Sequence, residues 1–482
     1  MYKLLLILKY LRRKLAPLFA AVAVMLCTAM VIIVMSVMGG FLDQFRVSAR
    51  NLTGDVIVES PSIGGFEGYE ELLEVLEELP EIAIGTPSIE TFGLVNFGDS
   101  AKPVRVQGVN LEKFEEIVGY RHTLLWKPEE LLGPIRELVP EGDPSLKTLE
   151  EKLHREHPID PGRGNGLPEA VIGVEVNPLH SRDENGQYAI NKSWAMRPLP
   201  LTVVPVSSSG TTSLEQERRE LLVVNEFKSG LFDIDGQYVF LPFETLQSML
   251  GMDERKGFDP TTIDPQTGLG GDEVTIPGRA NRLILKAAPG FTVEDARNAA
   301  QDAILIFYGD ALPFGTPRAY TWEDVHSQIL GAVQNEKGLI TFLFGVIGIV
   351  AIVMVATTFY MIVLEKTRDI GVLRAIGASR FGIIQMFLGY GLAIGVVGSL
   401  LGLLIAVGVV TNLNEIQDLI AKTTGWRMWN PQTYFFDRIP DQVDYAEAWF
   451  AVAGAVVSSV IGATLPALLA GRLKPVEALR YE

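Results

Sequence analysis

The sequence predicts an α-helical integral membrane protein with four transmembrane helices and a large α+β domain inserted between the first and the second helix. Almost half of the 482 residues are hydrophobic (48%), and four apolar segments are long enough to cross a bilayer. A long and more polar region, residues 39–337, separates the first apolar segment from the second. The segments richest in basic residues lie on one side of the predicted crossings.

The four apolar segments contain no charged residue and have the length of roughly 20 residues that a helix needs to cross the hydrocarbon core. The first is too long to be the apolar region of a cleaved secretory signal, so we predict an uncleaved anchor. It holds the chain's single cysteine, Cys27, so no intrachain disulfide is possible. The predicted spans are residues 16–38, 338–364, 381–411 and 448–470.

The charge distribution predicts the orientation of these spans. Residues 1–15 contain five basic side chains and no acidic one, whereas the whole chain has a net charge of −17. Segments 365–380 and 471–482 are also more basic than acidic. Because basic segments stay in the cytoplasm, both termini and the 365–380 segment are predicted there, with 39–337 and 412–447 outside. The acidic exterior argues against a nucleic-acid partner, and solubility is its simplest explanation.

The external region mixes strand and helix patterns. Residues 39–119 and 281–337 are predicted to form one α+β core, because some runs alternate apolar and polar residues and others repeat at helical spacing. Residues 120–280 are rich in Pro, Gly, Asp and Asn, which predicts a β-rich insertion with long loops. The strand-like runs are 54–60, 101–110, 201–206, 220–227, 236–242 and 281–287, and the helix-like runs are 69–80 and 293–307.

The sequence contains no familiar catalytic motif. It has no phosphate-binding loop for ATP, no zinc-hydrolase motif and no nucleophile elbow. His154 and His157 lie one helical turn apart, but without a third ligand a solvated helix explains them better than a metal site. We therefore predict neither a metal nor a cofactor bound by this chain, and no enzymatic activity of its own.

The segment "EKTRDIGVLRAIGAS", residues 365–379, is a short charged stretch between two uncharged spans. On a helical wheel Ile370, Leu373 and Ile376 fall on one arc, with Arg368 and Arg374 on the other. The residues alone support two explanations equally. The helix could dock on a partner protein, or it could cap the membrane surface with basic residues that only set the topology.

Several motifs carry a family resemblance. The sequence "EKTRDIGVLRAIGASRFGIIQMFLGYG" resembles the cytoplasmic loop and third helix of ABC-transporter permeases of the FtsX/MacB superfamily. Within that superfamily, "VMSVMGGFLDQFR", "TWEDVHSQILGAVQNEK" and "LPALLAGRLKPVEALRYE" resemble the lipoprotein-releasing permeases of the LolC/LolE type. The resemblance covers the membrane part, its flanks and residues 220–251, whereas residues 120–200 diverge.

The resemblance implies an ATP-driven machine of two permease subunits and two separate ATPase subunits, which moves lipoproteins out of the inner membrane. ATP and Mg²⁺ would be bound by the partner ATPase. The other implied partners are a second permease copy or a paralogue, the lipoprotein substrate, membrane lipid and a periplasmic carrier. In the resembled permeases the 365–379 segment is the coupling helix that contacts the ATPase. The residues given this role are Arg368, Asp369, Ile370, Leu373, Arg374 and Ile376.

Lipid-anchored cargo also implies an apolar cavity. Exposing acyl chains to water costs roughly 0.8 kcal/mol per methylene, so the chains must pass through an apolar environment. Residues at the outer ends of the first two spans lie at the right depth, and methionine suits variable lipid. Ordinary packing between helices explains any one of them equally well. The cavity residues are Val34, Met35, Met38, Phe41, Leu339, Phe342 and Leu343.

Residues 205–219, "PVSSSGTTSLEQERR", lie between two strand-like runs and predict a protruding hairpin or loop. In the resembled permeases that recruit a carrier, a hairpin near this position binds it. The contacts would then be Leu214, Arg218 and Arg219. The loop lacks an aromatic anchor, so a plain solvent-exposed connection is the better-supported explanation.

Two further functions fit the sequence. One is another role in the superfamily, such as peptide or drug efflux, or relay of ATPase motion to a cell-wall hydrolase. The other is a membrane-anchored enzyme or binding module that works without ATP. In addition, Gly391/Gly395 and Gly398/Gly402 have the spacing of closely packed helices, which leaves open whether they pack within one subunit or between two.

Overall fold

The computed structural model confirms four membrane-spanning helices. Each of the four is long and apolar enough to cross a bilayer. The chain divides into two compact units, one of membrane helices and one formed by residues between Phe45 and Gln328. The structure describes residues 15–98, 100–125, 166–182, 188–189, 194–195, 197–206, 212, 215–258, 273–309, 316–425 and 438–474.

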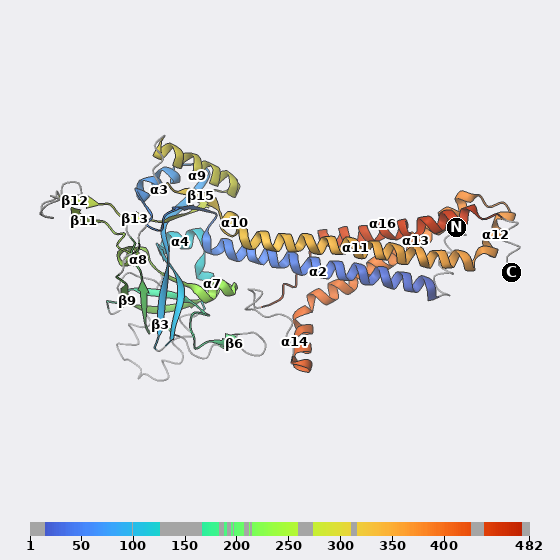
Figure 1. Cartoon of the computed structure of the whole chain (residues 1–482), viewed down its shortest axis with the longest axis horizontal. Helices are drawn as coiled ribbons and strands as arrows, with labels where there is room; N and C mark the ends of the chain where they lie inside the picture. The colour runs from blue at the N-terminus through green and yellow to red at the C-terminus, as the bar shows by residue number, and fades with distance from the viewer. Residues whose placement is uncertain are drawn as a thin grey trace. The chain divides into compact units, whose positions relative to one another are not determined.

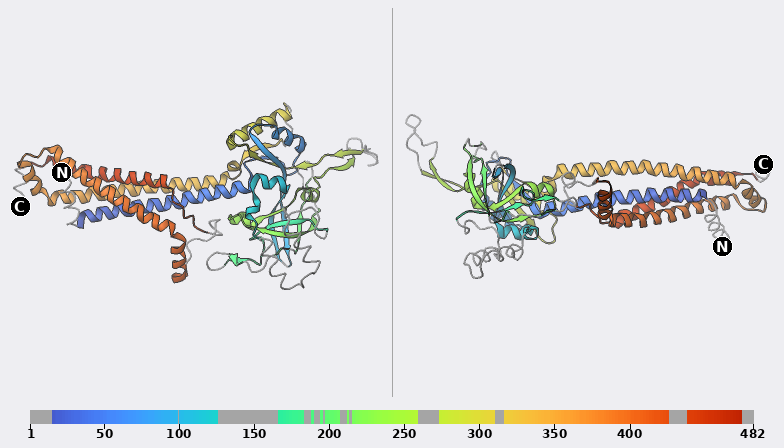
Figure 2. Two further views of the ribbon diagram at one scale, coloured as in Figure 1. Left: turned by 180° about the vertical axis from the view of Figure 1, so that it is seen from behind. Right: turned by 90° about the horizontal axis from the view of Figure 1, so that it is seen from below.

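The membrane helices run side by side (Figures 1 and 2). The first and the second helix are longer than the apolar segments that the sequence identifies. Their outer turns carry polar residues, so hydropathy alone does not include these turns in a membrane span. A short helix, α12, connects the second span to the third, and α14 turns away from the end of the third (Figure 1). The helices are α2 (Leu15–Thr53), α11 (Ser327–Glu365), α12 (Thr367–Ala375), α13 (Arg380–Thr411), α14 (Leu413–Thr424) and α16 (Tyr445–Arg472).

Glycines on two faces of α13 bring it close to two neighbouring helices. A Cβ atom at Gly391 would lie 2.5 Å from Cβ of Ala463 in α16, and one at Gly402 would lie 2.6 Å from the carbonyl oxygen of Met25 in α2. The hydroxyl of Ser459 in α16 donates to the Gly391 carbonyl over 2.8 Å. The first glycine pair therefore packs against α16 and the second against α2, so both pairs pack within one chain.

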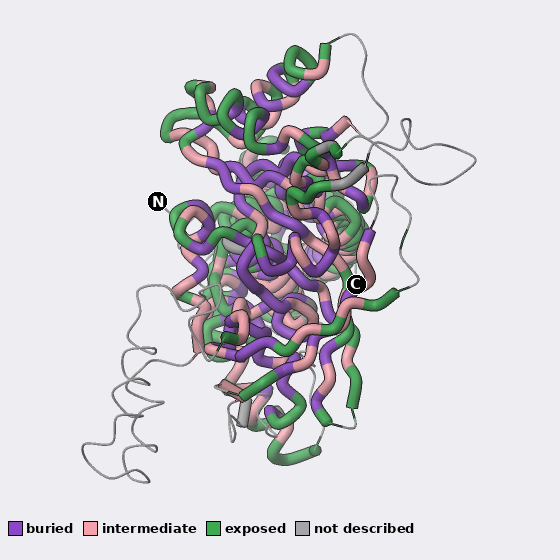
Figure 3. Tube along the Cα trace, turned by 90° about the vertical axis from the view of Figure 1, so that its left-hand side faces the viewer, coloured by how far each residue is buried: buried purple, intermediate pink, exposed green. Residues whose placement is uncertain are grey.

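The second unit is built on a nine-stranded mixed sheet flanked by helices, which confirms the predicted α+β class. The strand order is β15-β1-β14-β3-β4-β10-β5-β9-β8. The buried residues, purple in Figure 3, concentrate along its strands. The strands are β1 (Val56–Glu59), β3 (Ile82–Phe97), β4 (Ser100–Val109), β5 (Glu169–Gly173), β8 (Pro198–Val203), β9 (Glu217–Phe227), β10 (Tyr238–Pro242), β14 (Arg282–Ala287) and β15 (Arg318–Thr321).

Shorter elements complete this unit. α3 and α9 contact each other beside the part of the sheet that contains β1, β14 and β15, and two-residue or four-residue strands form three small ladders. The helices are α3 (Tyr69–Glu77), α4 (Leu111–Val118), α7 (Phe232–Gln237), α8 (Phe243–Met249), α9 (Val293–Tyr308) and α10 (Trp322–Val325), with a 3₁₀ turn at Tyr120–Thr123. The small ladders pair β2 (Phe66–Glu67) with β13 (Arg279–Ala280), β6 (Ser181–Arg182) with β7 (Tyr188–Ala189), and β11 (Arg255–Phe258) with β12 (Glu273–Ile276).

The main strands that the structure describes within residues 120–280 do not form a sheet of their own. β5, β8, β9 and β10 join the same sheet, and β8 also pairs with β3, so six strands close into a ring. Gly93 of β3 lies at this closure, where a Cβ atom would be 2.9 Å from Leu201 of β8. The composition of a segment reveals its strands but not their partners: β5 and β9 pair only with strands of this segment, whereas β10 and β8 also pair with β4 and β3 of the predicted core.

The glycine packing of α13 predicts a specific loss of stability. Gly402→Val should lower the free energy of unfolding by about 1–3 kcal/mol, because the added methyl groups would displace α2. Gly408→Val is the matched control, since a Cβ atom at Gly408 of the same helix meets nothing within 4 Å. Thermal unfolding of the purified chain in detergent, followed by circular dichroism, measures both variants. Equal midpoints for the two variants would show that α13 and α2 do not pack through Gly402.

Candidate functional site

The helix α12 is held on the membrane bundle by one of its faces. Ile370 is almost fully buried in the cluster formed by α11, α13 and α16, and Leu373 packs against the same cluster. Nη1 of Arg374 donates to the carbonyl oxygens of Gly471 (2.9 Å) and Leu473 (2.8 Å) at the end of α16. These three predicted coupling residues therefore contact the protein's own helices.

The opposite face of α12 is exposed. Arg368 and Asp369 lie in its first turn, where Asp369 pairs with Lys366 over 2.7 Å, and both are solvent-accessible. Val372 is 42% exposed and Ile376, just after the helix, is 80% exposed. Hydrophobic periodicity placed Ile370 and Ile376 on one arc, but the structure buries the first and exposes the second. The face open to a partner thus contains three of the six predicted residues.

The predicted cavity residues occupy two different environments. Those on α2 are half-buried or, at Phe41, buried, whereas those on α11 are exposed: Phe342 by 71%, Leu339 by 61% and Leu343 by 48%. The two helices are neighbours at this level, because the Thr341 hydroxyl lies 4.0 Å from Sδ of Met35. The α11 residues therefore present an uncovered apolar face beside α2.

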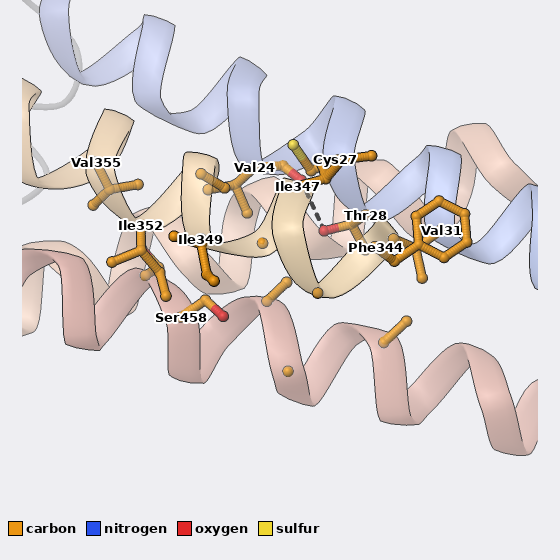
Figure 4. Close-up of a pocket in the computed structure, with 17 residues that line it drawn as sticks. Val24, Cys27, Thr28, Val31, Phe344, Ile347, Ile349, Ile352, Val355 and Ser458 are labelled. Atoms are coloured by element: carbon orange, nitrogen blue, oxygen red, sulfur yellow. Dashed lines mark hydrogen bonds between the residues drawn. The ribbon is translucent and has the colours of Figure 1, made fainter. Parts of the chain in front are cut away.

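A groove that sequence reasoning missed lies further along the same helices. α2, α11 and α16 line an apolar cavity of about 310 Å³, shown in Figure 4. None of the seven predicted cavity residues lines it. The sequence feature that could have indicated this groove is the pair Gly345 and Gly348, because two residues without side chains leave space on the surface of α11.

Within the second unit, Asp55 joins the end of α2 to two other segments. Its Oδ1 lies 2.6 Å from Nε of Arg50 in α2, and its Oδ2 accepts a hydrogen bond from the Ala287 amide over 2.9 Å. Its carbonyl oxygen accepts from the amide of Trp322, the first residue of α10, over 3.1 Å. One residue thus connects α2, β14 and the segment that leads into α11.

An aromatic contact reinforces this connection. The rings of Phe45 in α2 and His326 lie 5.8 Å apart in an edge-to-face arrangement. Burial lowers the pKa of His326, which favours the neutral ring at pH 7, and its Nδ1 lies 2.9 Å from the Trp322 carbonyl oxygen. The end of α2 and the segment that precedes α11 are therefore tied together within the second unit.

The two strands that flank residues 205–219 are adjacent, whereas residues 207–211 and 213–214 lie outside the described residues. β8 and β9 pair in antiparallel register up to Val203 and Glu217. The guanidinium of Arg279, which is 3% exposed, donates to the Val206 carbonyl over 3.2 Å and so anchors the start of the connection.

The three predicted carrier contacts differ in their surroundings. Arg218 is exposed, whereas Nη1 of Arg219 donates to the Ser248 hydroxyl over 3.0 Å. Leu214 lies outside the described residues, as do His154 and His157. Among the residues that the structure describes, no group of three or more His, Cys, Asp or Glu side chains is placed to hold a metal ion.

Comparisons with known proteins agree with the resemblance seen in the motifs. Residues 341–475 match the family model described as FtsX-like permease C-terminal, so this part of the chain is an FtsX-like permease domain. The chain is 23% identical over 460 residues to the lipoprotein-releasing system transmembrane protein LolC of Neisseria meningitidis serogroup B, which covers 94% of this chain and 90% of that protein. LolC of Haemophilus influenzae is 28% identical over 169 residues, 35% of this chain and 40% of its own length.

A solved structure also aligns with the chain. The periplasmic region of MacB from Actinobacillus actinomycetemcomitans covers 60% of this chain and 97% of its own length, at 10% identity and a TM-score of 0.29. The α+β assignment itself rests on the sheet and helices described above.

Proposed function

We propose that this chain is the permease subunit of an ATP-driven ABC transporter that extracts lipoproteins from the inner membrane for transfer toward the outer membrane. The observation that carries the proposal is the alignment with LolC along 94% of the chain, which includes the α+β domain as well as the FtsX-like domain. The chain would act with a separate ATPase that binds ATP and Mg²⁺, and with a second permease copy or a paralogue. Both termini and α12 would face the cytoplasm, as the basic segments predict.

In this proposal the exposed face of α12 docks on the ATPase. An exposed apolar side chain is a suitable anchor for an interface, and Ile376 is 80% exposed just after α12, two turns from the exposed Arg368 and Asp369. Movement of α12 would reach the bundle through Ile370, Leu373 and the bonds of Arg374 to the end of α16. α2 and α11 are continuous helices that would carry it to the junction at Asp55.

The uncovered apolar face of α11 would receive the acyl chains of the cargo. Phe342, Leu339 and Leu343 supply a surface to which an acyl chain could move from the bilayer without contact with water. Because each methylene exposed to water costs roughly 0.8 kcal/mol, such a continuous apolar route lowers the barrier to extraction. A second permease would complete the cavity.

A reconstituted release assay tests the proposed function. The chain is purified with its co-purifying ATPase and placed in proteoliposomes with a fluorescently labelled triacylated lipoprotein. ATP should release the lipoprotein to a soluble carrier, whereas a non-hydrolysable ATP analogue should not. Absence of release in the presence of active ATPase would favour efflux of another cargo or signal relay, and absence of any co-purifying ATPase would favour an ATP-independent role.

The docking face of α12 predicts the effect of one substitution. Ile376→Asp should weaken assembly with the ATPase by at least about tenfold, ~1.4 kcal/mol, because an unpaired carboxylate would be buried at the interface. Ile376→Leu is the matched control and should behave as the native chain. Co-purification of the ATPase and its stimulation are measured. Leu373→Asp is unsuitable for this purpose, since Leu373 packs against the membrane helices and its loss would also disturb the chain's own fold. Normal assembly of the Ile376→Asp variant would mean that α12 only caps the membrane.

The β8–β9 hairpin predicts where a carrier would bind. Replacing residues 207–215 by a short Gly-Ser turn should abolish carrier crosslinking and release but leave ATP hydrolysis intact, because the paired strands up to Val203 and Glu217 remain. Arg218→Ala should weaken crosslinking, and Arg218→Lys, which keeps the positive charge at this exposed position, is its control. Unchanged release after the replacement would show that the hairpin is only a connection.

A further inference from the structure

α11 and α16 are joined at two levels and stand apart between them. At the first level Nζ of Lys337 lies 2.7 Å from Oε1 of Glu447. At the second level a Cβ atom on Gly462 would lie 2.8 Å from the Ile352 carbonyl oxygen, so the two backbones are nearly in contact. The groove of about 310 Å³ lies between these levels, and α2 forms its third wall (Figure 4).

Three glycines keep this groove open. Gly345 and Gly348 in α11 and Gly454 in α16 line it, and a Cβ atom at any of them would meet nothing within 4 Å. The glycines of α13 are different, because a Cβ atom at Gly391 or Gly402 would collide with a neighbouring helix. The groove glycines therefore leave space instead of bringing helices together.

The lining of the groove suits an apolar ligand. The Thr28 hydroxyl donates to the Val24 carbonyl over 2.7 Å, drawn as a dashed line in Figure 4, and the Ser459 hydroxyl donates to the Gly391 carbonyl. Both donors are thus already used within the helices. The Ser458 hydroxyl and the Cys27 thiol also line the groove, and its other side chains are hydrocarbon, such as Val31, Phe344 and Ile352.

The groove is about as long as half of a hydrocarbon core and begins ~10 Å deeper than Lys337, so a lipid whose phosphate lies at Lys337 would enter it with the distal part of one extended acyl chain. From Phe344 to Val355, α11 rises by about 16 Å, and half of a hydrocarbon core is about 15 Å thick. Lys337 lies about 10 Å further along the helix, beyond the groove and toward headgroup depth. Its ammonium has three donors, so one bond to Glu447 leaves others for a phosphate.

We propose that the groove between α2, α11 and α16 binds one acyl chain of a bilayer phospholipid, with the lipid phosphate beside Lys337. The groove is complete within a single chain, so it can be filled before any second permease or cargo arrives. The bound acyl chain fills the space between the two levels at which α11 and α16 touch. It thereby supports α11, which has the smallest buried share of the four membrane helices. The site does not depend on the proposed lipoprotein cargo.

Photocrosslinking tests this site. The full chain is reconstituted with a phospholipid that carries a diazirine midway along one acyl chain, and adducts are located by mass spectrometry. Adducts should map to the peptides containing Cys27 and Gly348, which line the groove, and should saturate as the probe fraction rises. A yield that rises linearly with the probe, as at any lipid-exposed surface, would overturn the proposal without the use of any variant.

Variants that fill the groove give the second arm. Gly348→Leu and Gly454→Leu should reduce the groove adducts at least fivefold, whereas Gly408→Leu, at an equally open position of α13 outside the groove, should not change them. Thermal unfolding verifies that the variants are folded. Equal adduct yields in filled and control variants would contradict the site. Labelling by a diazirine-bearing lipoprotein but not by the phospholipid would assign the groove to cargo instead, which also overturns the proposal.

Discussion

The membrane unit depends on the close approach of α13 to two other helices. In a bilayer the hydrophobic effect does not drive helices together, so association relies on short backbone distances and good packing. Gly391 faces α16 and Gly402 faces α2, and the Ser459 hydroxyl adds a hydrogen bond to the first of these contacts. α13 therefore holds α2 and α16 in place, whereas α11 is held by its own contacts with α16.

This arrangement leaves α11 with fewer buried residues than the other three membrane helices. It contacts α16 at the Lys337 and Gly462 levels, and one of its faces, containing Phe342, is exposed. Glycines thus have two opposite effects: those of α13 allow tight contacts with α2 and α16, whereas those of α11 leave open space. A transport path and a lipid-binding groove both need such open space, whereas the tight contacts supply rigidity.

The junction at Asp55 and the anchoring of α12 have a common physical character. In each, one charged side chain bonds to groups from other segments, Asp55 to Arg50 and the Ala287 amide, and Arg374 to two carbonyl oxygens of α16. A charge-assisted bond is stronger than a neutral one and holds its partners in a defined direction. Such bonds suit positions where one element must move together with another.

The sequence by itself determined the spans, the α+β class of the inserted domain and several of its strands and helices, but it did not reveal β3, β5 or β15. These are local properties: the thickness of the bilayer sets the length of an apolar run, and side-chain periodicity follows from backbone geometry. The tertiary structure alone decided that β8 pairs with β3 to close a ring, that Ile370 is buried while Ile376 is exposed, and that Gly348 borders empty space while Gly402 touches α2. Periodicity shows that a residue belongs to an apolar face, but what that face meets depends on segments far away in the chain.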